Sequence, residues 1–214
     1  MTRALVATLG LVLALRVSAS GTVRVLAKDP KGAPVADAVA FVEALDAPAP
    51  VHPPADPVAI VQKDQEFVPY VTPIVVGTRV SFPNKDTVQH HVYSVSPAKK
   101  FEIPLYIGES SATILFDRPG PVTLGCNIHD WMVAYVYVLA TPYFAKTGAD
   151  GVADIAGLPP GRYTLELWHP RLAARVDRQI TIEASGDTVQ EVSVTLRPDR
   201  RIRRAPESDG AGYR

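Results

Sequence analysis

One short loop carries the residues that decide the fold: Gly125-Cys126-Asn127-Ile128-His129-Asp130-Trp131-Met132. The loop follows an alternating apolar run and gathers a thiol, an imidazole and a thioether within a few positions. Cys126 is the only cysteine of the chain, and Met132 is the only methionine besides Met1. Soft sulfur donors beside an imidazole are the ligand set that suits copper. The loop therefore predicts a copper site.

A copper ion held for electron transfer takes two imidazoles, one thiolate and a weak axial thioether. Cys126, His129 and Met132 supply three of these four ligands from the loop. The second imidazole must come from elsewhere, and His90 is the best candidate. It begins a β-rich run after the polar turn at 83–86, where a side chain can point into the end of a sandwich.

His91 directly follows the candidate ligand His90. Side chains alternate between the two faces of a strand, so we expect His91 to face away from the metal and to support the ligands from behind. The alternative that His91 replaces His90 or joins it stays open at this point.

Short alternating runs surround the loop from residue 59 onward, separated by turn signals such as Pro83-Asn84-Lys85-Asp86. Seven strands are expected: Ala59–Gln62, Glu66–Val71, Ile74–Phe82, His90–Val95, Thr113–Phe116, Val122–Cys126 and Val133–Leu139. With twenty prolines and fourteen glycines in the chain, long helices are not expected. The pattern predicts an all-β fold built on a β-sandwich.

Further strands are expected on both sides of this central block. Runs at 23–27 and 35–44 precede it, and a segment with five prolines at 46–58 predicts a stiff linker. After Thr141-Pro142 come about four more runs, including Gly157–Leu167. Two strands alone are marginally stable in water, so the opening pair needs partners from elsewhere in the chain.

The central block resembles the cupredoxins, the plastocyanin and amicyanin class of blue copper proteins. The spacing of Cys126, His129 and Met132 is similar to amicyanin's short ligand loop, and Asn84 lies six residues before His90 as in that family. The resemblance implies a Greek-key sandwich over 59–141 that binds one type 1 copper through His90, Cys126, His129 and Met132. Two departures are His91, where cupredoxins often have asparagine, and Asp130-Trp131, where amicyanin-like loops have proline and an aromatic residue.

The flanking runs resemble the carboxypeptidase regulatory-like, transthyretin-type sandwiches. That likeness rests on GLPPGRYTLEL at 157–167 and on the turn from Asp29 to Val35. It implies a discontinuous outer sandwich made of 20–45 and 142–197, with the cupredoxin-like block inserted. The competing arrangement pairs residues 21–45 with the central sheet. The whole chain also resembles bacterial proteins of the methylamine utilisation type, through the segments at 90–102 and 125–132.

The two ends of the chain carry their own signals. Residues 1–19 have a basic start, a short apolar run and small residues before Ser20. This pattern predicts a removable signal peptide and a periplasmic protein. Arg16, at the end of the apolar run, leaves open the alternative that the segment is retained as a membrane anchor. The apolar run is too short to span a bilayer, so no transmembrane segment is expected in the mature chain. The arginine-rich stretch at 198–214 predicts a disordered tail.

Basic and acidic residues balance at 22 each, which gives no reason to expect nucleic acid as a partner. A site with four protein ligands leaves no open position for a substrate, so we do not expect an enzyme. We expect a periplasmic carrier of single electrons between redox partner proteins. The alternative is a periplasmic copper chaperone or storage protein that uses the same ligands without redox cycling.

Overall fold

The computed structural model describes residues 20–109, 112–183 and 187–199. In these ranges every regular element is a strand, and the all-β class predicted from the alternating runs is confirmed. No helix in this part of the chain is long and apolar enough to cross a membrane. The expected signal peptide lies outside the described residues, as does almost all of the expected tail.

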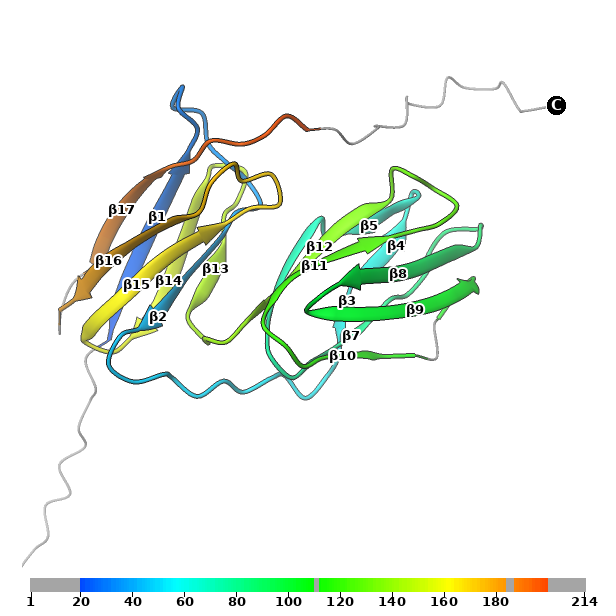
Figure 1. The fold of residues 1–214 in the computed structure, drawn as a ribbon, viewed down its shortest axis with the longest axis horizontal. Coiled ribbons are helices and arrows are strands. Elements are labelled where there is room, and N and C mark those ends of the chain that lie inside the picture. The colour runs from blue at the N-terminus through cyan, green and yellow to red at the C-terminus, as the bar shows by residue number, and fades with distance from the viewer. Residues whose placement is uncertain (1–19, 110–111, 184–186, 200–214) are drawn as a thin grey trace, which may run out of the picture.

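One sandwich is built from the two ends of the described chain (Figure 1). Its strands are β1 (Gly21–Lys28), β2 (Val39–Ala44), β13 (Phe144–Lys146), β14 (Val152–Leu158), β15 (Gly161–Trp168), β16 (Val176–Ile182) and β17 (Asp187–Ser193). One sheet has the order β14-β1-β17 and the other β13-β2-β15-β16. In the described residues β1 and β2 pair only with strands after residue 142, so the competing arrangement with the central sheet is wrong.

β1 lies in the middle of its sheet and, as its alternating sequence predicts, buries one face. Val23, Val25 and Ala27 are buried, and the residues between them are partly or fully exposed. β1 runs antiparallel to β14 and parallel to β17, so one edge of the opening strand is closed by the last described strand. The buried side chains meet those of β2 and β15 in a single core.

The central sandwich contains the remaining strands. They are β3 (Val58–Ala59), β4 (Val61–Lys63), β5 (Glu66–Val68), β6 (Val71–Val75), β7 (Thr78–Ser81), β8 (His90–Ser96), β9 (Lys99–Tyr106), β10 (Ile114–Phe116), β11 (Gly120–Gly125) and β12 (Val133–Leu139). A five-stranded sheet of order β6-β12-β11-β8-β9 faces a three-stranded sheet of order β10-β7-β3, and β4 pairs with β5. Phe82, Phe116, Leu124 and Val136 fill the core between them.

Several observed strands differ from the expected ones. The run at 74–82 is divided between β6 and β7, because the chain turns at Gly77 with a φ of 88°. The run at 35–44 forms a strand only from Val39. β9 was not expected at all, since two lysines and Pro104 interrupt its pattern; β9 is the edge of its sheet, where proline and lysine are tolerated.

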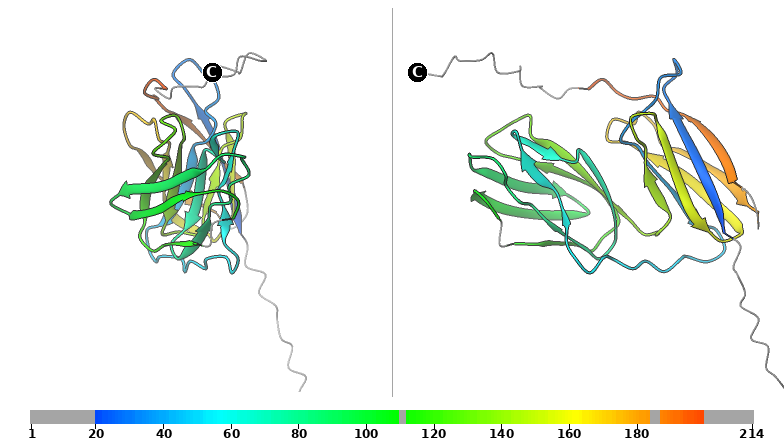
Figure 2. Two further views of the ribbon diagram at one scale, coloured as in Figure 1. Left: turned by 90° about the vertical axis from the view of Figure 1, so that its right-hand side faces the viewer. Right: turned by 180° about the vertical axis from the view of Figure 1, so that it is seen from behind.

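A cluster of apolar and aromatic side chains joins the two sandwiches. Val39 and Phe41 of the outer sandwich pack with Val71 and Leu139 of the central one. Trp168 stacks on Tyr137 with ring centroids 4.6 Å apart. Figure 2 shows the two sandwiches side by side, with the proline-rich segment running along one side of both.

Candidate metal centre

The loop that carries the sulfur atoms connects two antiparallel neighbours, β11 and β12. Gly125 is the last residue of β11, and a β-carbon there would lie 2.9 Å from the ring of Tyr93, so a side chain at this position would have to displace that ring. The loop closes with a hydrogen bond of 3.0 Å from the Met132 N–H to the His129 carbonyl. Cys126 is 4% exposed, and its thiol therefore points into the end of the sandwich.

His90 comes to the same place from the neighbouring strand. It is the first residue of β8, which pairs with β11 where Gly125 lies opposite Tyr93. The loop before it is held by Asn84, whose amide donates to the carbonyls of Val88 and Tyr106 at 2.9 and 3.0 Å. His90 is fully buried, so its ring has one fixed environment.

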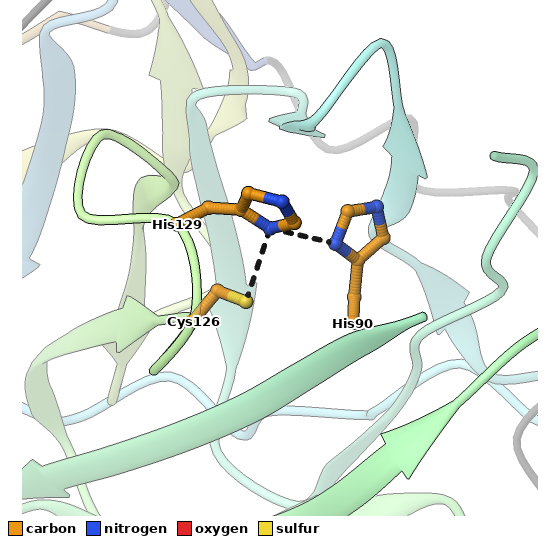
Figure 3. A group of neighbouring side chains, drawn as sticks. All are labelled: His90, Cys126 and His129. Carbon is orange, nitrogen blue, oxygen red and sulfur yellow. Dashed lines mark hydrogen bonds between the residues drawn. The ribbon is translucent and has the colours of Figure 1, made fainter. Parts of the chain in front are cut away.

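His90, Cys126 and His129 form a compact group, drawn in Figure 3. The Cys126 Sγ lies 3.7 Å from the His129 Nδ1, and the two Nδ1 atoms of His129 and His90 are 3.2 Å apart. One ligating atom from each residue lies within 4.8 Å of the others. The structure thus brings together two imidazoles and a thiol from residues that lie up to 39 positions apart in the sequence, from His90 to His129.

The spacing of these donor atoms fits a single ion. With bonds of about 2.0 Å to nitrogen and about 2.3 Å to sulfur, a trigonal site separates two nitrogens by about 3.5 Å and nitrogen from sulfur by about 3.8 Å. The separations of 3.2 Å between the two nitrogens and 3.7 Å between the His129 nitrogen and the sulfur are close to these values, and the donor atoms of His90 and Cys126 lie within 4.8 Å of each other. Two imidazoles and a thiolate are also the donor set expected of a copper site for electron transfer.

Met132 and Trp131 complete the loop around this group. Met132 is 1% exposed and belongs to the same core cluster as Cys126. The ring centroid of Trp131 is 5.3 Å from that of His129, and its Nε1–H donates to the Gln65 carbonyl. The group contains His90, Cys126 and His129, and ligation by Met132 stays a prediction.

His91 lies outside the group. Its Nε2 is 2.8 Å from the Glu102 carboxylate, and its ring lines a hollow with Tyr93, Lys100 and Asn127. Its Nδ1 is buried and has no hydrogen-bond partner among the described residues. His91 therefore faces away from the position shared by His90 and His129, as strand alternation predicts.

Sequence reasoning missed one residue that contacts the group. The Oδ2 of Asp86 is 2.7 Å from the His90 Nε2, the nitrogen that faces away from Cys126 and His129. Asp86 stands in a segment of proline, asparagine and lysine that predicts a turn, so nothing in the local pattern gives the carboxylate a second role. The four-residue spacing between Asp86 and His90 was the only available signal.

No protein-family model matches the sequence, and no curated protein is similar enough to count as a match. Several solved structures are similar to it. A purple cupredoxin from Nitrosopumilus maritimus is 24% identical, with 38% of this chain and 99% of that chain covered and a TM-score of 0.34. A reduced mutant of amicyanin is 18% identical, with 40% of this chain and 85% of that chain covered and a TM-score of 0.37.

These structural neighbours are cupredoxins. The Cu-containing nitrite reductase of Thermus scotoductus is also similar, at 26% identity and a TM-score of 0.37. That match covers 54% of this chain and 28% of the reductase.

Proposed function

We propose that this protein is a periplasmic copper protein that carries single electrons between redox partner proteins. The observation that carries the proposal is the convergence of His90 Nδ1, His129 Nδ1 and the Cys126 thiol at one end of the central sandwich. Met132, from the same loop, is the proposed weak fourth ligand. Bound copper would supply the one-electron chemistry by alternating between Cu(I) and Cu(II).

The protein's own contribution is to hold the donors in one arrangement. His90 is fixed by β8 and by the hydrogen bonds of Asn84, and Cys126 is fixed by β11 directly before it. A donor set held by strands changes little when the charge of the bound ion changes, which favours electron transfer. His129 is only half-buried, and we assign it as the side chain through which electrons leave and enter.

The remaining parts of the chain fit this proposal. We propose that 1–19 is a signal peptide, that 59–141 forms the copper domain and that 20–45 with 142–197 forms a docking or spacing domain joined by the linker at 46–58. With four protein ligands the ion has no open position, so we propose no enzymatic activity. The cluster around Trp168 would keep the two domains in fixed orientation.

Copper loading of the full chain tests the function. We expect one copper per protein, an intense visible absorption band from the Cys126 thiolate, a reversible reduction potential and the electron paramagnetic resonance spectrum of a type 1 site. Cys126→Ser should abolish the band. His52→Ala, which alters an exposed histidine in the proline-rich segment, should leave the spectrum unchanged.

Two results would contradict the proposal. A Cu(II) spectrum of the open tetragonal kind would show that Met132 stays off the ion and that the site binds water. Tight binding of Cu(I) without a stable oxidised form would favour the alternative of a copper chaperone or storage protein.

A further inference from the structure

The Asp86 carboxylate makes three polar contacts at once. The backbone N–H groups of Asp64 and Gln65 donate to it at 2.6 and 2.9 Å, from the turn between β4 and β5. The His90 Nε2 lies 2.7 Å from the same oxygen that accepts from Gln65. The side chain of Asp86 is only 13% exposed, so the carboxylate is packed within this end of the sandwich.

These contacts decide which nitrogen of His90 carries the proton. Both oxygens of the Asp86 carboxylate face N–H donors, Oδ1 that of Asp64 and Oδ2 that of Gln65, so the carboxylate acts as an acceptor at this position. An ionised carboxylate only accepts hydrogen bonds, so the partner nitrogen Nε2 must be the donor. The lone pair of a neutral His90 then lies on Nδ1, the nitrogen 3.2 Å from His129.

We propose that Asp86 is a positioning residue of the metal centre. It selects the His90 tautomer with a bare Nδ1, fixes the ring plane and ties the β4–β5 turn to the site. A carboxylate behind a ligating imidazole makes that imidazole a stronger donor and stabilises the more highly charged ion. The inference rests on the proposed function, because it takes His90 as a ligand.

The position of Asp86 is itself held by a second layer of contacts. The Asn84 Oδ1 accepts the Asp86 backbone N–H at 2.9 Å, while the Asn84 amide binds the carbonyls of Val88 and Tyr106. Asn84 is buried, and its hydrogen bonds leave the loop before β8 little freedom. The path of hydrogen bonds therefore runs from the edge strand β9 through Asn84 and Asp86 to His90.

The chain offers a matched control in a second histidine and carboxylate pair. The Nε2 of His91 is 2.8 Å from Glu102, nearly the same separation as between His90 and Asp86. Glu102 is 70% exposed, and His91 lies outside the metal-binding group. Glu102→Gln removes the same charge from a neighbouring histidine without touching a proposed ligand.

The first measurement uses the metal-free full chain, and the wild type alone decides its outcome. Nitrogen-15 NMR of the imidazoles at about pH 8, where an ordinary imidazole is neutral, reports the tautomer. We expect His90 to be protonated on Nε2 alone in the wild type. In Asp86→Ala we expect both tautomers. A wild-type His90 protonated on Nδ1 would overturn the inference even if no variant folds.

The second measurement uses the copper-loaded protein. Asp86→Ala should weaken copper binding by about 10- to 100-fold, and Asp86→Asn, which keeps an acceptor but loses the charge, should raise the reduction potential. Glu102→Gln should change neither quantity. If copper affinity and reduction potential are unchanged in both Asp86 variants, the inference about Asp86 is overturned. The proposed function still stands in that case, provided the wild type gives a type 1 spectrum. A wild type without that spectrum would overturn the function, and the metal-free tautomer would still decide the role of Asp86.

Discussion

Tyr106 lies beside the candidate site and makes stability depend on pH. Its hydroxyl donates to the Phe82 carbonyl and accepts from the Gln62 amide. Burial raises the pKa of Tyr106 to about 12 against the lowering effect of the Gln62 hydrogen bond, and the charges of Glu109 and Cys126 make smaller raising contributions. The folded protein thus holds this phenolic proton more tightly than an unfolded chain, whose tyrosine titrates near pH 10.

The sign of the effect follows from which state releases its proton first. Above about pH 10 the unfolded chain loses the proton while the folded protein keeps it, so stability falls between about pH 10 and 12 by about 2 to 3 kcal/mol. Tyr106→Phe should be less stable than wild type at pH 8 because it loses two hydrogen bonds, and this deficit should shrink toward pH 12. Urea denaturation across this range measures it, and a constant deficit would contradict the prediction.

The residues of the site differ in how far sequence could predict them. Cys126 and His129 stand in one loop, so their spacing alone indicates shared chemistry, and His90 could be inferred because a strand start after a turn points into the end of a sandwich. The structure brings these three together. Asp86 could not be predicted, because its role depends on the β4–β5 turn folding against it, which is a contact between segments 21 residues apart.

At the scale of single elements, the turn before β14 depends on a glycine. Gly151 has a φ of 75°, and a β-carbon there would lie 2.6 Å from the Ala27 carbonyl of β1, a backbone atom that cannot move aside. Gly157 has almost the same φ, 76°, but nothing lies within 4 Å of its β-carbon position. The two glycines therefore share the backbone strain that a side chain would cause and differ only in the clash.

We expect Gly157→Ala to lower the free energy of unfolding by about 1 kcal/mol, since alanine is strained at positive φ. Gly151→Ala should cost about 1 to 3 kcal/mol more, because it must also separate β14 from β1. Thermal or urea denaturation of both variants gives the difference directly. Equal losses would show that the approach of Ala27 to this turn does not matter for stability.

Strands with regular alternation were predicted well, and the edge strand was not. β1 and β12 bury every second residue on the core side, so period two marks them clearly. β9 has exposed or half-exposed residues at nearly every position, because one edge is unpaired and its outer face meets solvent. A local pattern cannot show that Lys99–Tyr106 pairs with β8, since the pairing is set by the hairpin they form together.

At the scale of the whole molecule, the two sandwiches are joined by aromatic packing. Tyr135 and Tyr137 point away from the core of the central sandwich and meet Trp168, with centroids 6.2 and 4.6 Å away. Lys146 of β13 adds a hydrogen bond of 3.0 Å to the Val71 carbonyl of β6. The alternation of β12 thus serves two cores at once, one on each face.

We expect Trp168→Ala to lower stability by about 2 to 3 kcal/mol and to separate unfolding into two transitions. Trp131 is then the only tryptophan, so its fluorescence follows the central sandwich, while circular dichroism follows the whole chain. Tyr143→Ala, which removes an aromatic residue packed on the outer core, is the control and should leave a single transition. Coincident transitions in the Trp168 variant would contradict the prediction.

The place of β1 between β14 and β17 also sets an order in which the two sandwiches can be completed. The central sandwich is continuous in the chain, so a chain that emerges N-terminus first has all its strands once β12 is free. β1, although made first, must wait until residues 187–193 emerge before its second edge is covered. Such a chain can therefore complete the central sandwich before the outer one, and until then the open edge of Gly21–Lys28 is free to pair with other strands.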